Sequence, residues 1–264
     1  MTKKYELVLD DTISFWGWKL FRIRALISFG SVEVGDLGGY IEKEDNLSHD
    51  GNAWVYGNAK VWGNAEVSGN AKVWGNAKVW GNAEVSGNAK VWGDAWVSGN
   101  AKVWGDAEVS GNAKVWGNAK VWGNAEVSGN AKVWGDAEVS GNAKVWGDAE
   151  VSGNAEVSGN AKVWGNAEVS GNAKVWGDAE VSGNAKVWGD AEVSELGDII
   201  VFKNHWSSGR YFTYTKSNKM WKVGCFHGTG QELIEKAYRD SEKSGNYYKA
   251  YVDFVETLER LSEE

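Results

Sequence analysis

Cys225 and His227 are the most chemically suggestive pair in the chain, a thiol and an imidazole separated by one residue. Such a pair can bind a metal or form part of an activated nucleophile. Zinc prefers four ligands, however, and the sequence supplies no second pair of ligands beside this one. On a strand the two side chains would share one face, which is common in a packed sheet. We interpret this segment as a structural strand end.

Other reactive residue types also lack the partners that their chemistry needs. Gly228-Thr229-Gly230 precedes a helical pattern, but it has no P-loop lysine and no full dinucleotide fingerprint, so we expect a turn and a helix cap. The serines of the repeat described below have no recurring His or Asp to activate them. In the Gly-Asn turn pairs of the same repeat, Asp replaces Asn six times, and a turn tolerates either residue. We therefore predict no catalytic, cofactor or metal site.

The composition narrows the class of protein. With 28 Lys and Arg against 36 Asp and Glu the net charge is -8, which disfavours nonspecific nucleic-acid binding. A single cysteine excludes an intramolecular disulfide and favours the cytoplasm. No apolar run approaches the roughly 18 residues of a membrane span, so we expect neither a membrane segment nor an export signal. The 18 tryptophans and the absence of proline favour continuous strands.

A six-residue repeat organises the chain and must position all of these residues. It runs from Gly51 to Ser194 as 24 hexapeptides of the form Gly-[Asn/Asp]-Ala-[Lys/Glu/Trp]-Val-[Trp/Ser/Tyr]. Ala and Val alternate with the two variable positions, so they point into a core while the variable side chains face solvent. Gly-Asn is a turn pair that tolerates positive φ. A strand and a corner at fixed spacing wind into a solenoid.

The repeat resembles the hexapeptide-repeat proteins with a left-handed β-helix. The resemblance implies an all-β fold in which three hexapeptides form one triangular coil, giving about eight coils with Val and Ala inside. Trp or Ser follows the Val, where many members of that family carry Gly. Charge supports three hexapeptides per coil, because two per coil would produce longer columns of lysine. The best-known members are acyltransferases with a histidine base, but residues 51–194 contain no histidine; His49, His205 and His227 lie outside the repeat.

The outward tryptophans are the strongest candidate binding residues. Lys always precedes Val-Trp and Glu always precedes Val-Ser, except in Trp54-Val55-Tyr56 and Trp96-Val97-Ser98. Every third hexapeptide should stack, so no column has more than two Trp in succession, and we expect no more than two Lys before an opposite charge. Either ring stacking or a contact surface explains such rows. The predicted neighbours, taken as partner-binding candidates, are Trp74 and Trp92, Trp146 and Trp164, Trp62 and Trp80, Trp116 and Trp134, and Trp104 and Trp122.

The segments on either side of the repeat should cap the solenoid. Residues 1–50 predict a capping segment with two strands around Gly17 and loops from Phe29-Gly30 through Gly38-Gly39. Residues 195–264 predict an α+β module: strands in 198–205, 210–216 and 219–226, then helices over 231–244 and 246–264. The phrase LFRIRAL…GDLGGYIEKEDNLS before the GNA repeats resembles proteins often carried by phages and prophages, across residues 1–194. That group implies no reaction.

These observations favour a non-enzymatic scaffold or binding protein of phage or prophage origin in the host cytoplasm. It would present charged and aromatic rows to a protein partner, such as a host or defence protein, or self-associate as a homo-oligomer. A carbohydrate-binding or virion-surface protein is the main alternative, because tryptophan also stacks on sugars. An acyltransferase and an ice-binding protein fit less well, the latter because Trp and charges interrupt every face. A chain designed from a consensus hexapeptide would show the same regular repeat.

Overall fold

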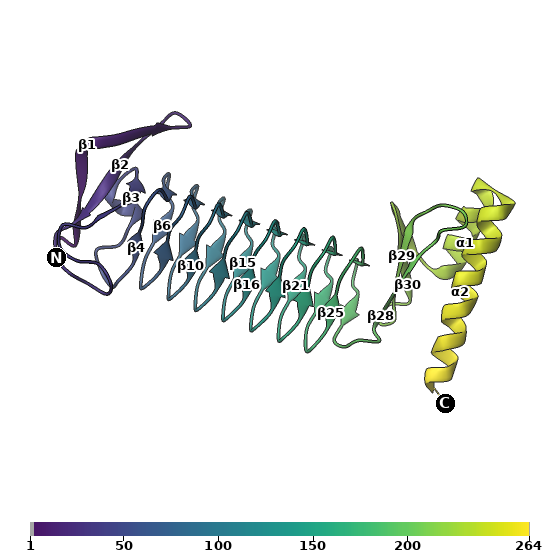
Figure 1. The fold of residues 1–264 in the computed structure, drawn as a ribbon. Coiled ribbons are helices and arrows are strands. Elements are labelled where there is room, and N and C mark those ends of the chain that lie inside the picture. The colour runs from purple at the N-terminus through teal and green to yellow at the C-terminus, as the bar shows by residue number, and fades with distance from the viewer. Residues whose placement is uncertain (1–2, 264) are drawn as a thin grey trace.

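The repeat forms a parallel β-solenoid, and the computed structural model describes residues 3–263 (Figure 1). Each hexapeptide contributes one strand of two residues, recurring every six residues from β4 (Trp54–Val55) and β5 (Lys60–Val61) to β26 (Lys186–Val187) and β27 (Glu192–Val193). Residues 18 apart pair in parallel, as Lys90 does with Glu108. Three sheets therefore run along the solenoid, one on each side of the coil. The prediction of three hexapeptides per coil is confirmed.

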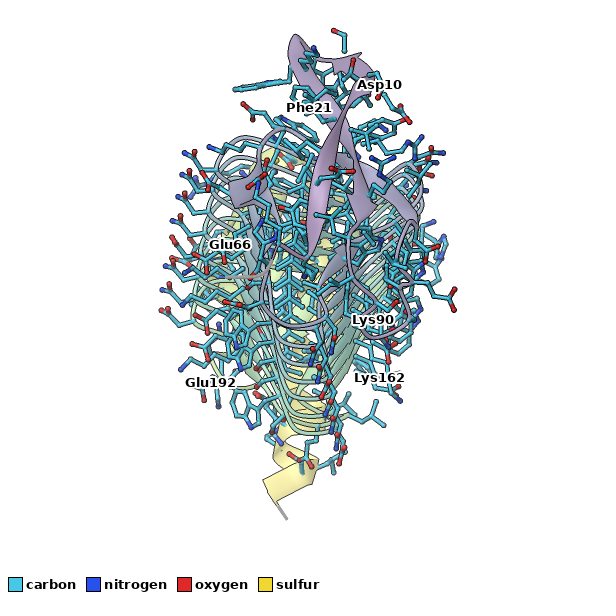
Figure 2. All side chains as sticks on the ribbon, turned by 90° about the vertical axis from the view of Figure 1, so that its left-hand side faces the viewer. Asp10, Phe21, Glu66, Lys90, Lys162 and Glu192 are labelled. Atoms are coloured by element: carbon cyan, nitrogen blue, oxygen red, sulfur yellow. The ribbon has the colours of Figure 1, made fainter. Side chains whose placement is uncertain are left out.

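Along the repeat the core of the solenoid consists of Ala and Val, and at its N-terminal end Trp54, Ile41 and Leu47 join it. The Ala and Val of every hexapeptide are fully or almost fully buried, whereas the fourth and sixth residues are half-buried or exposed, except Trp54, Trp62 and Ser98. Figure 2 looks along the solenoid and shows these side chains radiating from it, with Glu66 and Glu192 on one flank and Lys90 and Lys162 on the opposite flank. The predicted inward and outward positions are confirmed.

Glycine at each corner of the coil is required for two physical reasons. Its φ lies between +59° and +76° throughout the repeat, a region that L side chains rarely adopt. At every corner except Gly57 and Gly183 a neighbouring segment also approaches closely. A Cβ on Gly117, for example, would lie 3.0 Å from both the backbone nitrogen and the backbone oxygen of Gly135 in the next coil. The corner therefore excludes every residue with a side chain, irrespective of polarity.

The N-terminal segment is a hairpin followed by an irregular first coil. β1 (Tyr5–Phe15) and β2 (Trp18–Ala25) are antiparallel, as predicted around Gly17. β3 (Leu37–Ile41) pairs in parallel with β5, and a short 3-10 helix, η1 (Glu44–Asn46), follows. The expected loop at Gly38-Gly39 is wrong, because both residues lie inside β3. They are glycines because neighbours pack against them: a Cβ on Gly39 would lie 2.6 Å from the carbonyl oxygen of Ala59.

Polar groups of this segment cover the carbonyls at the first coil. The Lys4 ammonium donates to Ala53 O at 2.9 Å, and the Asn46 side-chain amide donates to Ala65 O at 2.8 Å. Backbone N–H groups supply further donors: Tyr40 N–H donates to Ala59 O. An open β-solenoid end would leave such groups without partners, and this end is closed by donors.

The C-terminal module is a four-stranded antiparallel sheet with two helices. The sheet comprises β28 (Ile199–Lys203), β29 (Tyr211–Thr215), β30 (Met220–Val223) and β31 (Phe226–Gly228), and the helices are α1 (Gly230–Asp240) and α2 (Glu242–Glu263). The first two expected strands and the two helices are confirmed, whereas the third expected strand, 219–226, is broken by a turn at Gly224-Cys225 into β30 and β31. The expected helix boundary is wrong, because α2 begins at Glu242 and Gly245 lies inside it. Gly245 packs directly against the ring of Tyr238, where a side chain would clash.

Side-chain oxygens of this module accept the N–H groups at the last coil. Lys186 N–H donates to Thr213 Oγ1 at 2.9 Å, Glu192 N–H to Ser217 Oγ at 2.8 Å, and Ser194 N–H to the Asp198 carboxylate at 2.7 Å. The two ends of the solenoid are therefore closed by complementary chemistry, with donors at the first coil and acceptors at the last.

Candidate interaction surface: the tryptophan rows

The ten candidate tryptophans form five stacked pairs, each joining successive coils. The rings in each pair are within 7° of parallel. The cause is the strand spacing of about 4.8 Å, which brings identical side chains of successive coils into register. The pairs and their centroid separations are Trp62–Trp80 (5.1 Å), Trp74–Trp92 (4.8 Å), Trp104–Trp122 (5.1 Å), Trp116–Trp134 (5.0 Å) and Trp146–Trp164 (5.0 Å).

Most of these rings are half-buried, but Trp62 does not lie on the free surface. It is only 3% exposed, because the tip of the β1–β2 hairpin covers it. Phe15 and Trp16 both meet its ring edge-on, at 5.5 and 5.7 Å between centroids. Trp16 itself has a φ of +51° and remains 59% exposed. Trp62 therefore belongs to the packing between hairpin and solenoid, and nine candidates remain accessible.

Lys and Glu at the fourth hexapeptide position form ion pairs along the columns. Each pair links successive coils and is partly exposed, so each adds little to the stability of the fold. The attraction within a pair also shifts titration: the hydrogen bond to Glu108 raises the pKa of Lys90. The pairs are Lys90–Glu108, Lys102–Glu84, Lys120–Glu138, Lys132–Glu150, Lys144–Glu126, Lys162–Glu180 and Lys186–Glu168.

One column departs from the predicted limit of two lysines before an opposite charge. It reads Lys60, Lys78, Trp96, Lys114 and Lys132 before Glu150 appears. The prediction is wrong here because an indole ring, not a carboxylate, separates the lysines. The ammonium groups of Lys78 and Lys114 lie 5.4 and 4.3 Å from the centre of the Trp96 ring. Trp96 thus acts as a neutral spacer that attracts both cations.

The first groove lies between a tryptophan pair and the neighbouring charged column, close to the N-terminal segment. It has a volume of about 620 Å³. The Tyr56 hydroxyl lies 3.1 Å from Ser31 Oγ, which joins the groove to the N-terminal segment. Lys72 stacks between Trp54 and Lys90, so its column neighbours include no carboxylate. The lining residues are Ser31, Tyr56, Lys72, Trp74, Lys90, Trp92 and Glu108.

A second groove, of about 530 Å³, surrounds Ser98 on the adjacent side of the coil. Ser98 occupies a row position between Trp80 and Trp116, and the Trp96 ring packs edge-on against Trp80 at 5.5 Å. The sequence analysis did not include Trp96 among the candidate binding residues. Its unusual hexapeptide, with Trp at the position where most others have Lys or Glu, could have indicated a special role. The lining residues are Trp80, Trp96, Ser98, Lys114, Val115, Trp116, Lys132, Trp134 and Glu150.

Ladders of side-chain amides run along the corners between these faces. In the longest, Asn64 donates to Asn82, which donates in turn to Asn100, Asn118 and finally Asp136. A carboxylate accepts hydrogen bonds but cannot donate one, so Asp is found where a ladder ends. Asp106, Asp148, Asp178 and Asp190 end ladders in the same way. Asp is therefore a terminator of the ladders and not only a substitute for Asn in a turn.

The residues first considered for chemistry remain dispersed. Cys225 lies in the turn between β30 and β31, so the expectation that it shares a strand face with His227 is wrong. His227 lies against Gly189 of the last coil, and its pKa is lowered by burial and by Lys222. Thr229 caps α1, as predicted, by accepting a hydrogen bond from Glu232 N–H. Residues 3–263 contain no cluster of three or more His, Cys, Asp or Glu suited to a metal.

None of the helices in residues 3–263 has the length and apolar character needed to span a bilayer. No protein-family model matches the chain, and no curated protein matches it. The stacked coils themselves define what it is: a β-solenoid repeat protein with a distinct module at each end.

Proposed function

We propose that the protein is a non-enzymatic scaffold that binds a protein partner through the first groove. The observation that carries the proposal is the combination of a half-buried pair of parallel indoles, Trp74 and Trp92, with Lys72. Aromatic residues are enriched where proteins bind one another, and the rigid solenoid holds these rings in place before binding.

The chemistry of the groove favours a partner segment with apolar and acidic side chains. Trp74 and Trp92 offer a flat apolar wall, and Tyr56 adds a hydroxyl at one end. Lys90 is already paired with Glu108, whereas Lys72 stands between Trp54 and Lys90. A carboxylate of the partner would relieve the repulsion between the two lysines and gain an ion pair partly shielded from water.

The resemblance of residues 1–194 to phage-associated proteins gives this proposal a biological setting. We place the protein in the host cytoplasm, where it would bind and interfere with a host or defence protein. The absence of histidine from residues 51–194 supports binding over acyl transfer.

The repeat supplies matched variants for a test. Trp74→Ser with Trp92→Ser introduces a residue that already occupies this row at Ser110 and Ser128, so the coils should fold unchanged. Trp104→Ser with Trp122→Ser removes an equivalent stacked pair outside both grooves. Quantitative pull-down from host lysate should lose the partner with the first variant and retain it with the second. Equal capture by both variants and the wild type would exclude the groove as the binding site.

A carbohydrate is the second candidate ligand, and the near-parallel indole pairs favour it. Flat aromatic faces stack on sugar rings, and Lys90 and Glu108 could hydrogen-bond to hydroxyls beside them. A glycan array distinguishes this candidate, because binding to a glycan that Trp74→Ser with Trp92→Ser abolishes would replace the protein partner with a sugar.

A further inference from the structure

α2 carries a second apolar stripe in addition to the one in the core of its module. Tyr248, Val252 and Val255 are buried against the rest of the module. The second stripe alternates steps of four and three residues, the spacing of a coiled-coil seam. It comprises Tyr247, Tyr251, Phe254, Leu258 and Leu261, of which the last three are 50%, 37% and 62% exposed.

The N-terminal half of this seam borders a hollow of about 380 Å³ whose lining is almost entirely apolar. Trp206, in the loop after β28, stacks on Tyr247 at 6.3 Å with the rings 12° from parallel, yet it remains 62% exposed. The hollow is lined by Phe202, Trp206, Tyr247, Ala250, Tyr251 and Phe254. Ala250 is small, so the backbone of a second helix could approach closely there.

The C-terminal half of the seam offers exposed apolar side chains instead of a hollow. The C-terminal turns of α2 extend beyond the sheet (Figure 1). Leu258 and Leu261, near the end of this helix, are exposed. The C-terminal module therefore carries both an apolar hollow, bordered by α2, Phe202 and Trp206, and two exposed leucines of a kind that would fill it.

We propose that two copies of this protein associate through α2, with the helices antiparallel. Each hollow then receives the leucine half of the other helix, placing Tyr247 opposite Leu258 of the second copy. A two-fold axis generates both contacts at once and closes the assembly as a dimer. The seam runs over 15 residues from Tyr247 to Leu261. It covers about 21 Å of helix, which is a short interface that should dissociate on dilution.

Charge favours the antiparallel arrangement over the parallel one. The C-terminal half of α2 carries Asp253, Glu256, Glu259 and Glu263 against Arg260, whereas the N-terminal half carries Lys243 and Lys249 against Glu242. Antiparallel helices bring the acidic half of each copy beside the basic half of the other. Parallel helices would instead bring the two acidic halves together.

Mass measurement across a dilution series tests the association. Sedimentation velocity of the full chain should show a dimer that gives way to monomer on dilution. Phe254→Glu with Leu258→Glu should abolish the dimer, while circular dichroism reports an intact fold. The matched control is Leu9→Glu with Leu196→Glu, which charges two leucines of greater exposure outside α2 and should leave the dimer unchanged. A wild-type monomer at every concentration, or a dimer unaffected by the α2 variant, would overturn the proposal.

Cysteine cross-linking tests the direction of the helices. In a Cys225→Ser background, a Tyr247→Cys chain mixed with a Leu258→Cys chain should form a mixed disulfide dimer under mild oxidation. Leu258→Cys alone should not cross-link, because antiparallel pairing separates the two copies of this position. Efficient cross-linking of Leu258→Cys alone would establish parallel helices and overturn the proposed geometry.

Discussion

The Lys114 ammonium lies 4.3 Å from the centre of the Trp96 ring, and Trp96 stands between Lys114 and Lys78 in the same column. The two lysines are two coils apart, and the indole fills the position between them. Seven other lysines of the repeat pair instead with a carboxylate of a neighbouring coil, as Lys132 does with Glu150. Trp96 therefore separates the like charges of this column, and its ring attracts the two ammonium groups in place of an ion pair.

Replacing Trp96 should reveal this role. Trp96→Lys would place Lys60, Lys78, Lys114 and Lys132 in one unbroken column with the new residue, so we expect a loss of about 1–3 kcal/mol in unfolding free energy. Trp96→Glu should lose less, because it forms ion pairs with both neighbours. Urea unfolding at low and high salt measures the difference. Salt should rescue the lysine variant selectively, and a loss independent of salt would contradict the charge-spacing role.

The regular part of the fold could be predicted because one short rule governs it. Val91 and Val109 face the core, Gly117 turns the corner, and residues 18 apart pair, all as a consequence of period and polarity. Each coil contacts only the coils next to it, so contacts distant in sequence have little influence on its structure. The stacked tryptophan pairs followed from the same rule.

The rest depends on contacts between segments that the repeat does not relate. The burial of Trp62 requires knowing that the hairpin tip with Trp16 lies over it. The groove at Trp74 is likewise completed by Ser31 from the N-terminal segment. Gly38 and Gly39 suggest a loop locally, but their role is set by packing against Ile23 and Ala59. Such long-range placement leaves no periodic signal.

The amide ladders predict opposite effects for two conservative changes. Asp106 accepts from Asn88 and cannot donate to Asn124, so Asp106→Asn should join two ladders and stabilise the fold by about 0.5–1 kcal/mol. Asn88→Asp should instead place a carboxylate beside Asp106 and destabilise the fold at neutral pH.

The pH dependence distinguishes this effect from a simple loss of hydrogen bonding. Two adjacent carboxylates raise their pKa in the folded state, so the folded Asn88→Asp variant binds a proton more tightly than the unfolded chain. Its deficit relative to the wild type should therefore shrink as the pH falls through that raised pKa. Thermal unfolding at neutral and mildly acidic pH measures this, and a deficit that is constant with pH would contradict the explanation.

Lys4 should give the N-terminal end a pH dependence of its own. The side chain is 1% exposed and donates to Ala53 O, and burial lowers its pKa to about 8, although Asp50 opposes the shift. Because the unfolded chain binds this proton more tightly, the contribution of Lys4 to stability should increase from about pH 8 to about pH 10.4. The stability difference between the wild type and Lys4→Met isolates it. A difference that does not change across this range would show that Lys4 titrates normally in the folded protein.

Thr213 should determine how firmly the last coil is closed. Its hydroxyl accepts the Lys186 N–H at 2.9 Å, and β29, to which it belongs, packs beside β26. Thr213→Val keeps the shape and removes the acceptor, so the buried N–H loses its partner at a cost of about 1–3 kcal/mol. Amide hydrogen exchange should accelerate at Lys186 and its neighbours in the last coil.

Ser217→Ala is the matched control, because it removes the acceptor of Glu192 N–H on a different side of the same coil. If each variant accelerates exchange mainly at its own amide, side-chain acceptors close the solenoid one strand at a time; equal acceleration at both amides would mean that the module detaches as a unit.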